Sequence, residues 1–317
     1  MIVTLTPNPS IDRTVTLAGK LRRGAVQRAE TVTSQAGGKG VNISRAAMKA
    51  EVPTLAVLPA DLDDPFVLEL RSDGIASEAV HPAGAMRVNI TISEPDGTTT
   101  KLNSPGPTVT AADLAALAEA VTRQAASADW VVLAGSLPPG APDEWYADIV
   151  AALRRGTSRV AVDTSDAPLR SLVERLAHGA PHLMKPNGEE LASFTGDDPV
   201  AIEADPAAAA RAATSLVEAG VDEVLVTLGP HGAVLVNASG AWHAAAPPTT
   251  VVSTVGAGDS SLFGYLLGDL RGLAPDQRLA LAVAYGSAAA GLPGTTIPRP
   301  DQVHPSLVPV REVLLAH

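Results

Sequence analysis

The sequence predicts a three-layer α/β fold, in which helices cover both faces of a mainly parallel central sheet and a small second sheet stands apart. Short apolar runs that end at proline or glycine alternate with longer amphipathic runs along most of the 317 residues, and this alternation is typical of βαβ units. Two segments, 13–36 and 86–102, alternate polar and apolar residues instead. Strands of that kind have one face in water, so we expect a separate antiparallel sheet.

The elements of the main sheet follow from these runs. The predicted strands are 1–6, 54–59, 130–133, 160–163, 183–185, 224–227 and 233–236. The predicted helices are 41–50, 66–73, 110–127, 143–154, 168–175, 188–195, 206–219, 259–270 and 276–290. Thr110 is a good N-cap for the third of these helices. No internal repeat and no linker interrupts the order, so we expect a single domain over residues 1–317.

The second sheet has its own signals. Val88, Ile90 and Ile92 alternate with polar residues, which indicates a half-buried strand. Asp96-Gly97 is a hairpin turn signal, and 98–102 would be the return strand.

Composition excludes several classes of function. The absence of cysteine rules out disulfides, thiolate metal sites and cysteine catalysis. The formal net charge of −11 argues against nucleic-acid or anionic-membrane partners. The first residues lack the pattern of a signal peptide, and no apolar stretch reaches the ~18 residues of a membrane span. We therefore expect a cytoplasmic protein, whose anionic ligands would need local basic residues inside a cleft.

A glycine-rich turn at 254–259, Thr-Val-Gly-Ala-Gly-Asp, stands at the start of the predicted helix 259–270. The backbone N–H groups of Gly256, Ala257 and Gly258 can converge there beside the helix N-terminus, which forms a cradle for a phosphate or a transferring phosphoryl group. Asp259 could also be no more than a helix cap. The turn is not a dinucleotide-binding fingerprint, because Ser261 takes the place of the third glycine.

Two further motifs fit phosphate chemistry, and each has a simpler explanation. Residues 37–40, Gly-Gly-Lys-Gly, resemble a phosphate-binding loop, but Val41 replaces the Ser or Thr that holds magnesium in a Walker A site, and the run could be a plain turn before a helix. Lys185 ends a strand, and Asn187 and Glu190 then lie on one helix face. Their oxygens suit Mg²⁺, although the same pair could form a capping box.

Several single residues follow strands or lie on them. Thr227 and Gly229 precede Gly232 after an apolar strand, where they could contact a nucleotide or simply form a tight hairpin. Ser136 lies in a turn after another strand. Asp12, Arg87 and Asn89 could be ligands or solvent-exposed side chains, and Arg87 and Asn89 share one face of their strand.

The order of these motifs along the whole chain resembles the ribokinase-like, or pfkB, carbohydrate kinases. It is most similar to the branch that phosphorylates sugar phosphates, which includes 1-phosphofructokinase and tagatose-6-phosphate kinase, through residues 4–12, 37–42 and 87–90. The resemblance implies a central sheet with flanking helices and a β lid, which matches the second sheet expected above. It also implies ATP and Mg²⁺ as cofactors, a sugar phosphate as substrate, and a homodimer that meets through the lid.

The resemblance gives each candidate a role. Asp259 would be the general base, and the N–H groups of Gly256, Ala257 and Gly258 would stabilise the transferring phosphoryl group. Asn187 and Glu190 would hold Mg²⁺ through water. The nucleotide would contact Lys185, Asn187, Thr227, Gly229, Gly232, Gly258 and Ser287. The sugar would contact Asp12, Gly37, Gly38, Asn42, Asn89 and Ser136, and its existing phosphate would contact Lys39, Arg87 and Arg28.

The acceptor remains open at this point. D-Fructose 1-phosphate is the leading acceptor, with tagatose 6-phosphate and fructose 6-phosphate as alternatives, because the position of the substrate phosphate depends on the geometry of the cleft. A regulator that binds nucleotide or sugar phosphate without turnover is a further alternative, which the intact 256–259 motif disfavours. One departure from the family concerns 58–61, Leu-Pro-Ala-Asp, where many relatives have a glycine-rich stretch.

Overall fold

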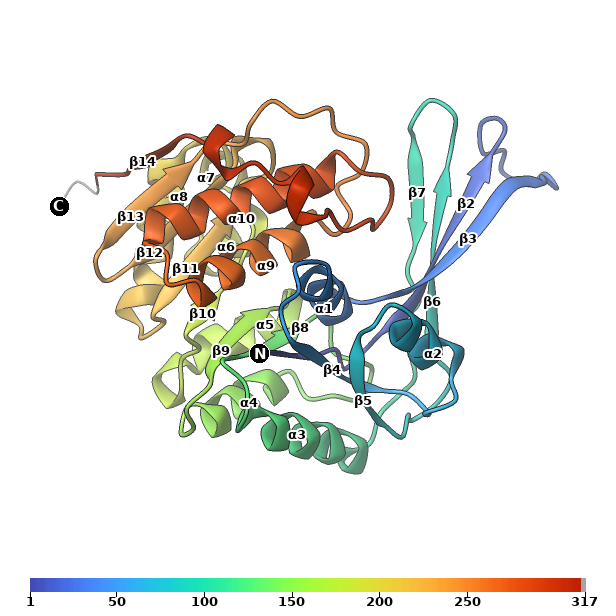
Figure 1. The fold of residues 1–317 in the computed structure, drawn as a ribbon, viewed down its shortest axis with the longest axis horizontal. Helices are drawn as coiled ribbons and strands as arrows, with labels where there is room; N and C mark the ends of the chain where they lie inside the picture. The colour runs from blue at the N-terminus through green and yellow to red at the C-terminus, as the bar shows by residue number, and fades with distance from the viewer. Residues whose placement is uncertain (315–317) are drawn as a thin grey trace.

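The main sheet of the computed structural model, which describes residues 1–314, has ten strands (Figure 1). They are β1 (Ile2–Leu5), β4 (Thr54–Pro59), β5 (Ala76–Val80), β8 (Trp130–Ala134), β9 (Arg159–Asp163), β10 (Leu183–Met184), β11 (Glu223–Thr227), β12 (Ala233–Asn237), β13 (Gly240–Ala244) and β14 (Val310–Glu312). Their order is β14-β13-β12-β11-β10-β9-β8-β1-β4-β5. Strands from β5 to β11 in this order are parallel, whereas β12, β13 and β14 pair antiparallel.

Helices cover both faces of this sheet (Figure 1). They are α1 (Lys39–Lys49), α2 (Pro65–Ser72), α3 (Ala111–Ala125), α4 (Trp145–Leu153), α5 (Asp166–Glu174), α6 (Gly188–Thr195), α7 (Pro199–Ala204), α8 (Pro206–Glu218), α9 (Ala257–Leu270) and α10 (Pro275–Ala290). Short 3₁₀ turns are η1 (Leu176–His178), η2 (Gly229–His231), η3 (Pro300–Gln302) and η4 (Pro305–Leu307). Thr110 caps α3 as predicted, because its side chain accepts a hydrogen bond from the backbone N–H of Asp113.

The two faces of the sheet build two separate cores. On β8, Val131 and Leu133 pack into the core that contains α3, α4 and α5, whereas Trp130 and Val132 pack into the core that contains α9 and α10. This split follows from the two-residue period of a strand, which sends successive side chains to opposite faces. The predicted three-layer fold is therefore confirmed.

The second sheet rises from one side of the body (Figure 1). It contains β2 (Ser10–Leu17), β3 (Ala29–Gly37), β6 (Arg87–Ser93) and β7 (Thr99–Leu102), in the order β3-β2-β6-β7. The two segments predicted for it, 13–36 and 86–102, do form it, although β2 begins at Ser10. We call this sheet the lid.

The expectation that the lid is antiparallel was wrong for its central pair. β2 and β3 pair antiparallel, as do β6 and β7, but β2 and β6 are parallel. The reason lies in the connections. β2 follows β1 and β6 follows β5, and both β1 and β5 pair parallel with β4 in the main sheet. The two chain segments therefore leave the main sheet from strands that run in the same direction.

Four short elements were missed by the sequence patterns: β5, α7, β13 and β14. The segments of β5 (ASEAV) and β14 (VRE) contain charged residues and lack an unbroken apolar run. Both lie at the edges of the ten-stranded sheet, where one side of the strand needs no partner. The α7 segment has only six residues, which is too short for helical periodicity to stand out.

A buried charge cluster closes the end of the sheet where β8, β9 and β11 begin. The carboxylate of Asp269, near the end of α9, accepts hydrogen bonds from Trp130 Nε1 at 2.8 Å and Arg159 Nη1 at 2.6 Å. Arg278 of α10 adds a third contact to Asp269 at 3.2 Å and also pairs with Glu223. This cluster fixes the C-terminal end of α9 against three strands.

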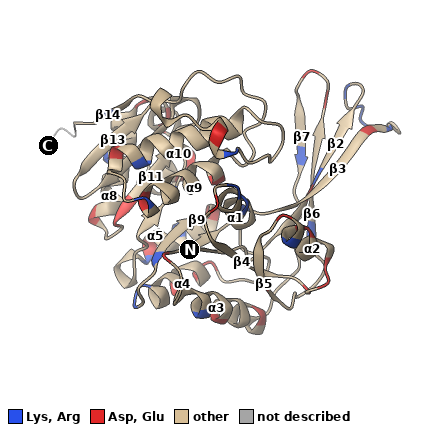
Figure 2. Cartoon of the chain, in the orientation of Figure 1, with Lys and Arg blue, Asp and Glu red and all other residues tan. Residues whose placement is uncertain are grey.

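In the view of Figure 2, acidic and basic residues are interspersed along the ribbon. Within residues 1–314, no helix is both long enough and apolar enough to cross a membrane.

The close packing of α9 on α10 generates a prediction about stability. A Cβ added at Gly264 would lie 2.6 Å from the carbonyl oxygen of Leu281 and 2.9 Å from the Cα of Ala282. Gly264→Ala is therefore expected to lower the free energy of unfolding by ~1–3 kcal/mol, as overpacked cores do, in a urea titration. Gly19→Ala is the control, because no atom lies within 4 Å of its added Cβ. Equal urea midpoints for the two variants would contradict this packing.

Candidate active site

The sequence motifs converge where parallel strands end. β8 is followed by the Gly135-Ser136 turn, β9 ends at Asp163, and β10 is followed by Lys185. The first residues of α1 and α9 face the same place, since Asn42 and Lys39 of α1 interact with Asp259 and Asp163. In open α/β sheets ligands bind beyond the carboxyl ends of the strands, so this cleft is the candidate active site.

Asp259 is a buried carboxylate in the cleft whose pKa is strongly raised. It lies in the first turn of α9 with 7% of its surface exposed, and its Oδ2 accepts a hydrogen bond from Asn42 Nδ2 at 2.8 Å. Burial, together with the charge of Asp163, raises the pKa of Asp259 to about 6, against the opposing effects of Lys39, Asn42 and Lys185. A carboxylate with this pKa is ionised at neutral pH yet can still accept a proton.

The turn before α9 is shaped to hold an anion. Gly256 adopts a left-handed conformation with φ of 78°, which glycine reaches without steric cost. The N–H groups of the first helical turn have no acceptor within the helix, and the helix dipole favours negative charge there. Lys185 adds a charge, because its Nζ lies 3.4 Å from where a Cβ of Gly258 would be. The turn of Gly256, Ala257 and Gly258 therefore has a lysine ammonium at Gly258 and is followed directly by the carboxylate of Asp259.

Two lysines share one buried carboxylate at the end of β9. Asp163 is fully buried, and its Oδ1 lies 2.6 Å from Lys39 Nζ while its Oδ2 lies 3.2 Å from Lys185 Nζ. Burial alone would raise the pKa of Asp163, but the two lysines outweigh it and hold that pKa below its ordinary value. Burial would lower the pKa of Lys39, and Asp163 and Asp259 raise it above its ordinary value instead. Asp163 and Lys39 therefore both stay charged.

A second group of side chains lies at the base of the lid. Asp12 Oδ1 accepts hydrogen bonds from Ser10 Oγ at 2.7 Å and from Asn89 Nδ2 at 3.2 Å. A Cβ on Gly37 would lie 2.2 Å from Asp12 Oδ2, so only glycine leaves this carboxylate in place. Arg87 belongs to the same group. Burial lowers the pKa of Arg87, and the nearby charge of Asp12 opposes that shift.

Arg87 and Ser136 are linked through Asn8, which follows β1. Arg87 Nε donates to the carbonyl oxygen of Asn8 at 3.2 Å, and its Nη1 donates to the carbonyl oxygen of Ser104 at 3.0 Å. Asn8 Nδ2 lies 3.4 Å from Ser136 Oγ. The structure therefore brings Asp12, Gly37, Asn89, Arg87 and Ser136 to one side of the cleft, at the foot of the lid.

The predicted magnesium ligands form a capping box. Asn187 Oδ1 accepts from the backbone N–H of Glu190 at 2.7 Å, and Glu190 Oε2 accepts from the backbone N–H of Asn187 at 2.9 Å. Burial raises the pKa of Glu190, although Lys39 and Lys185 oppose the shift, which places this carboxylate beside the two lysines. The capping box, which was the simpler explanation of this motif, is therefore formed. A role of Asn187 and Glu190 in binding a metal stays a prediction.

Some of the residues predicted to contact the nucleotide lie in tightly packed parts of the structure. A Cβ on Gly232 would lie 1.9 Å from the carbonyl oxygen of Ala244, so the start of β12 packs directly on the end of β13. Thr227 pairs with Asn187 through an isolated bridge, which joins this loop to the capping box. Ser287 lies on α10 next to Gly286, whose Cβ position is 3.3 Å from the carbonyl oxygen of Ala257.

Within one chain, Arg28 lies at the end of the lid that is far from Lys39 and Arg87. It precedes β3 at Ala29, and that end of β3 pairs with Leu17, whereas the other end, Gly37, pairs with Ser10. At ~3.3 Å per residue the two ends of β3 lie roughly 25 Å apart. The ammonium of Lys39 contacts Asp163, and a role of Lys39 in binding the phosphate of the sugar stays a prediction.

Asp163, Ser10 and Asn8 are site residues that the sequence patterns missed. Asp163 is the last residue of its predicted strand, and on the neighbouring strands the same edge carries Lys185, directly after β10, and Ser136, two residues after the end of β8. That shared edge is the signal that could have identified it.

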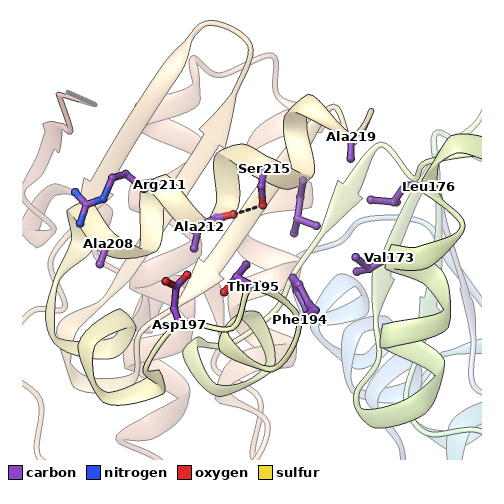
Figure 3. Close-up of a pocket in the computed structure, with 11 residues that line it drawn as sticks. Val173, Leu176, Phe194, Thr195, Asp197, Ala208, Arg211, Ala212, Ser215 and Ala219 are labelled. Atoms are coloured by element: carbon purple, nitrogen blue, oxygen red, sulfur yellow. Dashed lines mark hydrogen bonds between the residues drawn. The ribbon is translucent and has the colours of Figure 1, made fainter. Parts of the chain in front are cut away.

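A pocket of about 530 Å³ lies elsewhere, between the end of α5, the end of α6 and α8 (Figure 3). Its lining includes Val173, Phe194 and Leu216, and the small side chains of Ala208 and Ala212 leave the space. None of the cleft residues lines it. The converging charges favour the cleft as the candidate active site.

Comparison with known proteins fits this geometry. Residues 6–302 match the sequence profile of the pfkB family of carbohydrate kinases. The chain belongs to this family. The kinase is 36% identical over 305 residues to a 1-phosphofructokinase from Haloferax volcanii, a match that covers 96% of this chain and 95% of that protein.

Solved structures agree on the fold. Phosphofructokinase-2 from Escherichia coli, in complex with substrates and products, superposes with a TM-score of 0.86 at 28% identity, covering 95% of this kinase and 96% of that chain. Ribokinase from Thermotoga maritima gives a TM-score of 0.73 at 19% identity, covering 95% of this chain and 97% of its own, which supports the ribokinase-like fold alone.

The perturbed pKa of Asp259 generates a prediction about pH. Since a protonated carboxyl cannot accept a proton, kcat/KM of the kinase should fall as the pH drops below about 6. Asn42→Ala removes a hydrogen bond that favours the ionised form, so the acid limb should move to higher pH. Ser44→Ala is the matched control on the same helix, because it removes a buried bond to Thr4 instead. An Asn42→Ala limb that stays in place, or moves to lower pH, would contradict the assignment.

Proposed function

We propose that this kinase is a 1-phosphofructokinase, which transfers the γ-phosphoryl group of ATP to D-fructose 1-phosphate and gives fructose 1,6-bisphosphate and ADP. The observation that carries the proposal is the placement of the buried Asp259 carboxylate directly beside an anion-binding turn. The near full-length similarity to a 1-phosphofructokinase supports the choice of acceptor. An ATP-dependent reaction of this kind suits the cytoplasm.

The chemical step follows from the first turn of α9. The acceptor hydroxyl oxygen attacks the γ-phosphorus, the bond from that phosphorus to the β-phosphate oxygen of ADP breaks, and the hydroxyl proton passes to Asp259. The N–H groups of Gly256, Ala257 and Gly258, together with Lys185, stabilise the charge on the transferring group. Positioning and electrostatic stabilisation supply most of the catalysis in phosphoryl transfer.

The foot of the lid would bind the sugar phosphate. Asp12 and Asn42 can bond sugar hydroxyls, and Asn89 holds the Asp12 carboxylate in place at 3.2 Å. Arg87 uses Nε and Nη1 to bond backbone carbonyls, which leaves Nη2 to bond a phosphate oxygen. In a chain with a net charge of −11, such a local cation is what allows a dianionic substrate to bind.

The nucleotide would extend from Lys185 toward Thr227, Gly229 and Ser287. Within residues 1–314 no group of three or more His, Asp or Glu side chains could hold a metal ion by itself. Mg²⁺ that arrives on the nucleotide needs few protein ligands. Because Glu190 Oε2 and Asn187 Oδ1 are engaged in the capping box, Glu190 Oε1 is the oxygen that would hold the ion, through water. The ion would neutralise charge on the phosphates.

The lid would also be the dimer interface. Val26, Val32 and Leu102 have 98%, 56% and 55% of their surface exposed on the lid strands and their connections. A second copy would cover these apolar side chains.

One alternative acceptor has specific support. Phosphofructokinase-2, the structural relative named above, superposes over nearly the whole chain, which keeps fructose 6-phosphate as a candidate beside tagatose 6-phosphate.

A panel of acceptors tests the proposal. ADP release should be measured with Mg-ATP and fructose 1-phosphate, fructose 6-phosphate, tagatose 6-phosphate or free fructose. We expect kcat/KM to be highest for fructose 1-phosphate, and Asp259→Asn should lower kcat by ~10²–10⁴-fold because the general base is lost. A preference for another acceptor would replace the substrate assignment, and wild-type kcat in Asp259→Asn would refute the base.

A further inference from the structure

We propose that Asp163 is a positioning residue for phosphoryl transfer: its buried carboxylate holds Lys39 and Lys185 together at the anion-binding turn, so that both lysines act on the transferring phosphoryl group. The inference rests on the proposed function for the direction of transfer, but not on the identity of the acceptor. It also assigns Lys39 to the transferring phosphoryl group instead of the phosphate that the sugar already carries.

The three groups come from three separate elements. Asp163 ends β9, Lys39 begins α1 and Lys185 follows β10. Each carboxylate oxygen is used by a different lysine, at 2.6 Å for Lys39 and 3.2 Å for Lys185. The Asp163 side chain has no exposed surface and the Lys185 side chain has 5%, so water cannot replace Lys185, whereas the Lys39 side chain reaches Asp163 from the partly exposed side, with 36% of its surface accessible.

The pair of lysines lies on the side of the transferring group. Lys185 Nζ lies 3.4 Å from the Cβ position of Gly258, inside the anion-binding turn. Lys39 is linked to Lys185 through a single carboxylate, and the charge of Asp259 contributes to its raised pKa. Arg87 is the cation at the foot of the lid, where the Asp12 charge acts on it and where it bonds Asn8 and Ser104. The cleft therefore holds two cationic groups with separate anchors.

A carboxylate between the lysines has a physical purpose. Two ammonium groups close together repel each other, and each sits on a flexible side chain with about 2 kcal/mol of rotamer entropy. Asp163 offsets the repulsion and fixes both side chains before substrate binds. Preorganised cations cost no reorganisation when charge develops on the phosphoryl oxygens, which is where electrostatic catalysis gains most.

The simpler alternative is that Asp163 only neutralises the two lysines and stabilises the fold. Asp269 offers a matched control, because it is also a buried carboxylate with two cationic partners, Arg159 and Arg278, but it lies at the opposite end of α9. A purely structural role predicts that Asp163→Asn and Asp269→Asn both lower the melting temperature. It also predicts that the folded enzyme has the same kcat in both variants.

The test compares the kinetics of these two variants, with the best acceptor found in the panel. Asp163→Asn should lower kcat by ~10²-fold or more, the size of losing a preorganised charge-stabilising group, while KM for the sugar phosphate stays close to wild type. Asp269→Asn should keep the wild-type kcat. Arg87→Ala should show the opposite split, with a raised KM for the sugar phosphate and a smaller change in kcat.

The pH profile supplies a second readout. Asp163, Lys39 and Lys185 are the charged groups that act on Asp259, and Asp163 is the one that raises its pKa. Asp163→Asn should therefore move the acid limb of kcat/KM to lower pH, whereas Asp269→Asn should leave it in place.

Lys39→Met keeps the test decisive if Asp163→Asn does not fold, because it leaves the Asp163–Lys185 pair intact. It should lower kcat without raising KM for the sugar phosphate. Where Asp163→Asn does fold, the double variant should be no slower than the slower single variant. A rise in KM larger than the fall in kcat for Lys39→Met, or a kcat of Asp163→Asn equal to that of Asp269→Asn, overturns the proposal. A different preferred acceptor changes only the substrate used in these assays.

Discussion

The burial of one carboxylate at the first turn of a core helix constrains the rest of the structure. α9 is buried from Asp259 to Gly268, so its start is held by packing between the sheet and α10 rather than by a surface loop. Asp269 fixes the other end of the helix to Trp130 and Arg159. The desolvation that raises the pKa of Asp259 is thus a consequence of the core itself, and the same helix start presents the N–H groups of the anion-binding turn.

The cleft is built from carboxylates that balance cations. Asp163 lies between two lysines, and the charge of Asp12 acts on Arg87. Asn42 donates a hydrogen bond to Oδ2 of Asp259. This arrangement lets an acidic chain present fixed positive charge to anionic substrates without an extended basic surface. In the proposed binding mode, Arg87 and the two lysines would give the two ends of a sugar phosphate distinct environments.

Sequence patterns predicted the layers and most elements, because parallel strands that are buried on both faces are continuously apolar. They could not predict that β2 and β6 are parallel, since strand direction depends on where the connecting segments leave the main sheet. Local spacing identified Asp259, Asn187 and Lys185 as candidates. It missed Asp163, whose partners are 124 residues away at Lys39 and at the end of a neighbouring strand. The family resemblance grouped Arg28 with Lys39 and Arg87, although Arg28 lies at the end of β3 far from Gly37, because the type of charge does not show which end of a strand a residue occupies.

The most direct test of the central claim is a crystal structure of the kinase with ADP, aluminium fluoride and fructose 1-phosphate, which together mimic the transferring phosphoryl group. The account predicts a planar fluoride on the N–H groups of Gly256, Ala257 and Gly258, with the acceptor oxygen within ~3 Å of the Asp259 carboxylate, the reach of a general base. An acceptor oxygen that contacts another carboxylate, or a fluoride that lies away from this turn, would contradict it.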